Sequence, residues 1–227
     1  MSTTPAERGE LRRDVAEAAR ELAAAGLLIG TAGNVSARLG DLVAVTATGA
    51  HLDSCTPGQV TLVDLDGAVV EGDLAPTSEL ALHFGIYADR PSTQLGQVGA
   101  VVHTHAPFAT AVACVLDELP VLHYQQLALG GAIPVAPYAT FGTDELAASV
   151  RTALAGRSAA LMANHGSVAV GATLGKAVDN ALLLEWLCQL HHRASALGTP
   201  RVLTDDQQAD VIRVAIERNY GSTQENR

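Results

Sequence analysis

Residues 98–105 read Val98-Gly99-Ala100-Val101-Val102-His103-Thr104-His105, an apolar run that ends in two histidines one residue apart. The run predicts a buried strand over Val98 to His103, and side chains two residues apart on a strand share one face. The imidazoles of His103 and His105 therefore point the same way where the strand ends.

Apolar runs and turns alternate on both sides of this strand. Short apolar runs bounded by turn residues predict further strands at residues 42–45, 60–63, 68–70, 133–135, 159–163 and 168–170. Apolar residues at helical spacing predict helices at about residues 5–26, 78–87, 107–116, 143–154, 173–197 and 205–217. We therefore expect one α/β domain over residues 1–227, with a variable C-terminal tail after about residue 218.

A third histidine and a carboxylate extend the pair to a candidate metal site. His165 follows the apolar run Ala159–Ala163, and Glu79 follows Pro76-Thr77-Ser78 at a predicted helix start. Three imidazoles and one carboxylate form a ligand set that zinc accepts with room left for a substrate. A single strand-end histidine would more simply be a polar cap, but the i, i+2 pair together with His165 favours the metal site.

Three turns of small and hydroxyl-bearing residues predict an anion site. The glycine-rich segment 30–36 matches neither a dinucleotide-binding nor a Walker motif, so a plain tight turn is the alternative. Glycines let backbone N–H groups approach an anion, and the N-terminus of a helix, expected after residues 77–78, favours negative charge. The residues expected to hold a phosphate without any lysine are Gly33, Asn34, Thr48, Gly49, Thr77 and Ser78.

Composition excludes several classes of partner. Hydrophobic residues make up 48% of the chain and the formal net charge is −10, which argues against nucleic acid and anionic membranes. Cys55, Cys114 and Cys188 are widely spaced, as expected of reduced thiols rather than a disulfide framework. No apolar run is long enough to span a bilayer and no secretory leader is recognisable, so a cytoplasmic protein is expected.

Two further histidines lie beside candidate site residues. His83 follows Glu79 by one helical turn, where a histidine packed in the helix interface is expected, although it can also brace the site. His123 directly precedes Tyr124, and interface packing and orientation of the tyrosine are equally open roles for it.

Sequence motifs connect the chain to a known family. The stretches are GTAGNVSAR (30–38), TATG (46–49), PTSE (76–79), AVVHTHA (100–106), HYQQLALGG (123–131), IPVAPYATFGT (133–143) and NHG (164–166). In family order and over most of the chain, they resemble class II aldolases of the fuculose-phosphate type, whose superfamily also holds ribulose-phosphate 4-epimerases. The resemblance implies an α/β three-layer sandwich with a largely antiparallel central sheet flanked by helices. It also implies a ring-like homotetramer with metal sites between subunits.

The resemblance also assigns roles to individual residues. It implies one Zn²⁺ per subunit on Glu79, His103, His105 and His165, and phosphate binding by Asn34, Thr48, Gly49, Thr77 and Ser78. Tyr124 matches a tyrosine that reaches a neighbouring subunit's site and protonates the aldehyde oxygen. Phe141 and Tyr220 match aromatic residues at the aldehyde end of the substrate. The chain departs from the pattern at Glu217, where an aromatic residue is common, and by one residue fewer after Tyr124.

Together these features predict a metal-dependent aldolase. Cleavage of a carbon–carbon bond beside a ketone leaves negative charge that an electrophile such as zinc stabilises, while Glu79 serves as general base or acid. The expected reaction converts L-fuculose 1-phosphate to dihydroxyacetone phosphate and L-lactaldehyde. The alternatives are a sugar-phosphate 4-epimerase, dehydratase or decarboxylase on the same scaffold, or a non-catalytic adducin-like assembly module. Epimerases of this superfamily tend to carry aspartate at the position of Glu79, which favours the aldolase.

Overall fold

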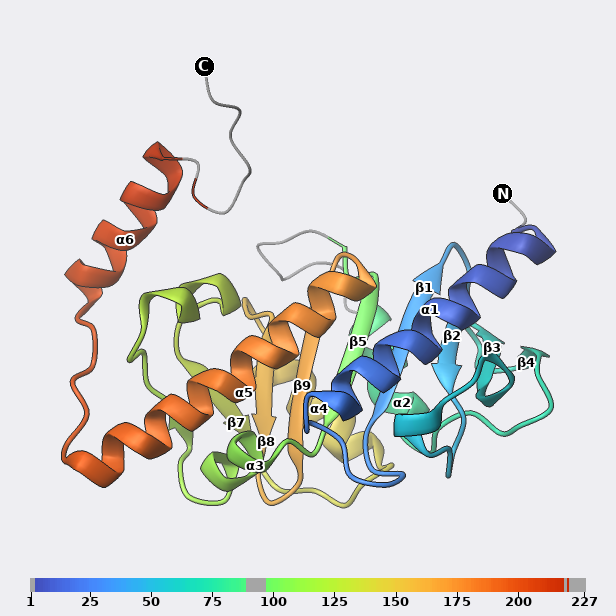
Figure 1. Ribbon diagram of the computed structural model, residues 1–227, viewed down its shortest axis with the longest axis horizontal. Helices are drawn as coiled ribbons and strands as arrows, with labels where there is room; N and C mark the ends of the chain where they lie inside the picture. Colours follow the sequence, from blue (N-terminus) through green and yellow to red (C-terminus); the bar gives the residue numbers. More distant parts are fainter. Residues whose placement is uncertain (1–2, 89–96, 219, 221–227) are drawn as a thin grey trace.

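One nine-stranded sheet organises the chain. A computed structural model describes residues 3–88, 97–218 and 220 (Figure 1). The strands lie in the order β4-β3-β2-β1-β5-β9-β8-β7-β6, and β7 and β8 pair in parallel whereas the other neighbours pair antiparallel. The α/β class and the largely antiparallel sheet expected from the sequence are therefore confirmed.

The seven predicted strands reappear with small shifts at their ends, and the sheet contains two further strands, β1 and β6, that were not predicted. The bounds of the nine strands are β1 (Asn34–Leu39), β2 (Leu42–Thr46), β3 (Val60–Asp64), β4 (Val69–Glu71), β5 (Ala100–Thr104), β6 (Glu118–Leu119), β7 (Ile133–Ala136), β8 (Ala159–Met162) and β9 (Gly166–Gly171). The strand predicted from Val98 begins at Ala100 as β5 and runs through His103 in the middle of the sheet.

Helices follow the predicted pattern closely. The α-helices are α1 (Pro5–Ala24), α2 (Leu80–Ala88), α3 (Pro107–Ala113), α4 (Asp144–Ala153), α5 (Leu174–Leu197) and α6 (Asp205–Glu217), and the 3₁₀ helices are η1 (Leu52–Ser54), η2 (Pro57–Gln59) and η3 (Tyr124–Leu129). The segment Thr4-Pro5-Ala6-Glu7 has the sequence signature of a capping box, and Thr4 and Glu7 form that box at the start of α1. None of the helices in the described ranges is long and apolar enough to cross a membrane.

Helices cover both faces of the sheet and create two hydrophobic cores. Residues of α1, α3 and α5 pack with one core, and residues of α2 and α4 pack with the other. In Figure 1, α1 and α5 cross in front of the sheet and α2 and α4 lie behind it. Alternation along β5 sends Val102 into the first core and Val101 into the second, so His103 lies on the α2 face.

The main difference from the sequence prediction is β1. The sequence predicts a turn over residues 30–36, but the chain turns only until Gly33 and then enters a strand that pairs with β2 and β5. Val35 and Ala37 face the first core, while Asn34 and Ser36 are buried on the α2 face. Buried polar side chains inside a central strand are stable only when each has a hydrogen-bond partner. The local sequence does not reveal those partners.

The C-terminal segment is set apart from the sheet. The helix α6 has no buried residue and projects from one end of the molecule (Figure 1). The predicted variable tail lies outside the described residues, except for Arg218 and Tyr220.

Candidate active site

Three imidazoles meet at the end of β5. His103 lies within β5, His105 follows it, and His165 lies in the turn between β8 and β9. Each pair of rings has a centroid separation of 4.9 Å, and one nitrogen from each ring lies within 4.8 Å of the others. The i, i+2 pair and the third strand-end histidine therefore come together as predicted.

Glycines permit this close approach. A Cβ atom on Gly33, whose φ is +92°, would lie 2.8 Å from the carbonyl oxygen of His103. A Cβ on Gly166 would clash with the carbonyl oxygen of Thr104. These contacts leave no room for a side chain at either position. Only glycine at residues 33 and 166 lets the chain pass this close to β5.

Glu79, the residue that precedes α2, completes the cluster. Its Oε2 atom lies 3.2 Å from Nε2 of His103, and its Oε1 atom lies 3.6 Å from Nε2 of His165. The carboxylate is buried, and Oε1 has no hydrogen-bond partner among the described residues. A buried carboxylate oxygen without a partner is costly unless a cation or proton satisfies it.

Hydrogen bonding orients His103 toward the same point. Its Nδ1 atom lies 2.9 Å from the backbone carbonyl oxygen of Ser167, which can only accept, so Nδ1 carries the proton. Its Nε2 atom then points at the cluster, 3.1 Å from Nε2 of His105. Ligand atoms in a tetrahedron around one zinc ion lie roughly 3.3 Å apart, so this donor set fits zinc.

Electrostatics keep the donors in their metal-binding forms. Burial lowers the pKa of His105 to about 4 and also lowers the pKa of His165, with the neighbouring His103 adding to both shifts. Burial works against ionisation of Glu79, but the hydrogen bond and charge of His103, the Asn34 amide and His165 hold the pKa of Glu79 at about 2. Neutral rings at His105 and His165 beside an ionised carboxylate at Glu79 are the forms that bind a divalent cation.

A cavity of about 480 Å³ opens above the cluster. Glu79, His105 and His165 line it, and Thr77 N–H donates to the carbonyl of Thr46, which joins two of the predicted turns. Among the described residues that line it, none is lysine or arginine. The lining includes every residue expected to bind phosphate: Gly33, Asn34, Thr48, Gly49, Thr77 and Ser78.

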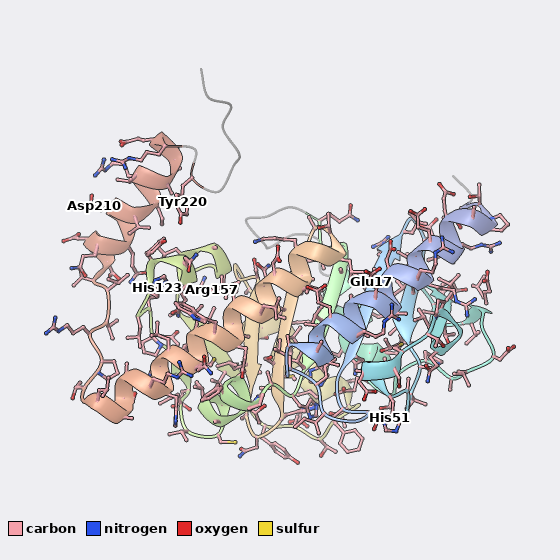
Figure 2. All side chains as sticks on the ribbon, viewed as in Figure 1. Glu17, His51, His123, Arg157, Asp210 and Tyr220 are labelled. Carbon is pink, nitrogen blue, oxygen red and sulfur yellow. The ribbon has the colours of Figure 1, made fainter. Side chains whose placement is uncertain are left out.

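The aromatic residues divide between two places. Phe141 lines the cavity, as does the exposed Tyr138, which sequence reasoning did not single out. Tyr124 and Tyr220 do not line it: their hydroxyls lie 3.0 Å apart beside a separate depression of about 400 Å³ against α6. In Figure 2, Tyr220 and His123 lie toward the end of the molecule from which α6 projects, and His51, which follows the Gly49 turn, lies well away from them at the lower edge.

A single chain therefore does not bring Tyr124 or Tyr220 to its own histidine cluster. His123 packs between Tyr124 and Trp186, with ring-centroid separations of 4.6 Å and 5.0 Å. Both roles left open for His123, packing and orientation of the tyrosine, agree with this arrangement.

Comparison with known proteins places this geometry in a family. Residues 13–192 match the Class II Aldolase and Adducin N-terminal domain family. A 5-methylthioribulose-1-phosphate/5-deoxyribulose-1-phosphate aldolase from Rhodospirillum rubrum is 39% identical over 209 residues, covering 92% of each chain. An L-fuculose phosphate aldolase from Escherichia coli K12 is 39% identical over 207 residues, covering 91% of this chain and 94% of the relative.

Structure comparison agrees. A solved L-fuculose 1-phosphate aldolase matches with a TM-score of 0.84 at 30% sequence identity, covering 94% of this chain and 97% of that one. The chain therefore belongs to the class II aldolase and adducin N-terminal domain family, within which it is a class II aldolase, a lyase with a candidate metal site of three histidines.

Proposed function

We propose that this aldolase cleaves a ketose 1-phosphate, preferentially L-fuculose 1-phosphate, to dihydroxyacetone phosphate and L-lactaldehyde. One observation carries the proposal: a single cavity has a metal-ligating cluster at its base and three turns of N–H and hydroxyl donors around it. A phosphorylated ketose offers chelating oxygens to the first and an anion to the second.

The residues that would hold one Zn²⁺ per subunit are Glu79, His103, His105 and His165. Bound there, the cation would supply an electrophile that lowers the energy of negative charge on the substrate oxygens. The imidazole set, with its single carboxylate, suits zinc better than magnesium or calcium, which prefer oxygen ligands.

Proton transfers fall to side chains of the chain itself. In the synthesis direction, the ionised carboxylate of Glu79 takes a proton from the reacting carbon of dihydroxyacetone phosphate. The electron pair left on that carbon forms the new carbon–carbon bond to the aldehyde, and Tyr124 donates its proton to the aldehyde oxygen, which becomes a hydroxyl. Cleavage is the reverse: the deprotonated form of Tyr124 takes the hydroxyl proton, the carbon–carbon bond breaks, and the protonated form of Glu79 returns a proton to the carbon. The hydrogen bond between Tyr124 and Tyr220 raises the pKa of Tyr124, which suits a group that donates its proton to the aldehyde oxygen in synthesis.

Because Tyr124 lies away from the cluster of its own chain, the mechanism requires a neighbouring subunit. A homotetramer with shared sites, expected from the family resemblance, supplies the tyrosine by symmetry. Tyr220, hydrogen-bonded to Tyr124, would accompany it into the neighbour's cavity and meet Phe141 at the aldehyde end.

A second substrate deserves direct comparison because the Rhodospirillum rubrum relative matches as well as the Escherichia coli one. Its name specifies 5-methylthioribulose 1-phosphate and 5-deoxyribulose 1-phosphate. These substrates share the phosphorylated three-carbon half with fuculose 1-phosphate and differ only in the aldehyde that is released.

The test is a substrate panel with the purified zinc-loaded protein. L-fuculose 1-phosphate, 5-methylthioribulose 1-phosphate and 5-deoxyribulose 1-phosphate are compared by kcat/KM, with dihydroxyacetone phosphate as the measured product. A pentulose 5-phosphate tests for 4-epimerisation in parallel. Activity that a chelator abolishes and zinc restores supports the proposal. Absence of dihydroxyacetone phosphate from every ketose 1-phosphate refutes it.

A further inference from the structure

A row of buried polar side chains runs from the candidate site into the interior. Glu79, His83 and Tyr87 follow one another at four-residue intervals at and along α2, so they lie on one helix face. Asn34 and Ser36 lie two residues apart on β1, on the sheet face that α2 covers.

The two rows match in spacing. Four residues of an α-helix rise about 6.0 Å, and two residues of a strand rise about 6.6–6.8 Å. The side chains can therefore interleave over this short length. Asn34 lies opposite His103 in the β1–β5 register, which anchors the strand row directly beside a candidate metal ligand.

Four hydrogen bonds join the rows into one chain. Oε2 of Glu79 lies 2.9 Å from Nδ2 of Asn34, and Oδ1 of Asn34 contacts Nε2 of His83. Nδ1 of His83 lies 2.7 Å from Oγ of Ser36, which lies 2.8 Å from the hydroxyl of Tyr87.

The amide of Asn34 fixes the direction of every bond in this chain. Its Nδ2 donates to Oε2 of Glu79, so its Oδ1, which only accepts, faces His83. His83 must then donate from Nε2, which leaves Nδ1 to accept from Ser36. The hydroxyl of Tyr87 donates to Ser36 and completes the series.

Burial makes this arrangement consequential. His83 and Ser36 are fully buried, and Asn34 is 4% exposed. Burial, aided by the nearby His103, lowers the pKa of His83 to about 3, so the ring is neutral and has one N–H to give. If that N–H were lost, the buried Oδ1 of Asn34 would lose its donor, and the amide would be held less firmly against the Glu79 carboxylate.

We propose that His83 is a positioning residue: its Nε2–H holds the Asn34 amide in the orientation that aligns the Glu79 carboxylate for proton transfer at the substrate carbon. The inference rests on the base role proposed above for Glu79. It replaces the expectation that His83 is only a histidine packed in a helix interface, since a packing role needs volume but no N–H at Nε2.

Two substitutions at His83 separate donation from packing. His83→Met fills a similar volume and cannot donate, whereas His83→Gln carries an amide N–H₂ that can reach the position of Nε2. His191→Met, on α5 and outside the hydrogen-bonded chain, is the matched control for loss of a helix histidine. Folding of each protein is checked by thermal melting, and zinc content by elemental analysis.

We expect His83→Met to lower kcat by about 10- to 100-fold, the usual effect of removing a partner that orients a ligand. The KM for the ketose 1-phosphate should stay within about twofold, since five of the six residues expected to bind phosphate, all but Asn34, lie outside this hydrogen-bonded chain. His83→Gln should recover most of kcat, and His191→Met should match the wild type. Wild-type kcat in His83→Met, or a parallel rise in KM for both His83 variants, overturns the inference.

The ring tautomer gives a readout that does not depend on turnover. ¹⁵N NMR of the imidazole should show the proton of His83 on Nε2 in the zinc-loaded wild type and equally in the metal-free protein. A proton on Nδ1 overturns the inference whether or not the protein cleaves any substrate. Wild-type cleavage is measured first, so a failure of the proposed reaction is recognised separately from a failure of the His83 assignment.

Discussion

Replacing Glu185 by glutamine should destabilise the helix that follows the metal ligands. The first residue of α3 is Pro107, and Ala106 at the N-cap position has no side chain to cap it. Glu185 reaches across from α5 instead, and its two carboxylate oxygens accept the N–H groups of Phe108 and Ala109 at 2.9 Å and 2.8 Å. This carboxylate acts as a cap that comes from another helix.

The size of the effect follows from these two bonds. A hydrogen bond to a charged group contributes about 1.5–3 kcal/mol net, and glutamine keeps only one oxygen acceptor while turning its N–H₂ toward the other N–H. Since Glu185 is half-buried rather than fully buried, the lower end applies, and the expected loss is about 2 kcal/mol. For a chain of this size each kcal/mol lowers Tm by about 2–4 °C, so Tm should fall by about 4–8 °C.

Glu17→Gln, at an exposed position on α1, is the control because it removes the same charge. Figure 2 shows Glu17 on the outer face of the molecule. Melting is followed by far-UV circular dichroism in the presence of chelator and at one protein concentration, because bound metal and assembly would both raise Tm. If Glu185→Gln melts within about 1 °C of Glu17→Gln, the carboxylate is not capping α3 and the reasoning is wrong.

Four further outcomes are expected. His165→Ala should lose zinc by elemental analysis, and full zinc retention would exclude it as a ligand. Ser78→Asp should raise KM for the phosphorylated ketose steeply with zinc unchanged, because it adds negative charge beside the expected phosphate; an unchanged KM would place the anion elsewhere. Gly166→Ala should reduce soluble yield or Tm because its Cβ meets backbone, and wild-type melting would contradict that. Tyr124→Phe and Glu79→Gln, each expected to slow cleavage, should regain activity when their subunits are exchanged; exchange without recovery would mean that Tyr124 acts within its own subunit or not at all.

Local patterns were sufficient for much of this structure. The alternation that ends in His103 and His105 predicts both a buried strand and a shared direction for two imidazoles, and β5 shows both. The capping residues Thr4 and Glu7 mark the start of α1 for the same reason, since each signal lies within one turn of chain.

Features that depend on distant partners were not predictable in this way. The sequence of segment 30–36 does not reveal β1, because it starts with glycines and continues with polar residues. The buried polar Ser36 is explained by its hydrogen bonds to His83 and Tyr87 on α2, which lie far away in the sequence. The contact between Tyr124 and Tyr220 spans 96 residues and depends on where α6 projects, which no periodicity in either segment reveals.

The central position of β5 ties the metal site to the order of folding. The bond from His103 to the Ser167 carbonyl joins groups 64 residues apart, and it can form only after β9 has paired with β5. Such long-range pairing is slow, because the chain loses loop entropy before the contacts compensate for it. Zinc would therefore find its full ligand set only in chains in which β5 and β9 have paired. Its binding would stabilise those chains against unfolding. The rate of zinc binding during refolding would then report the rate at which the sheet closes, a step that follows the formation of the local helices.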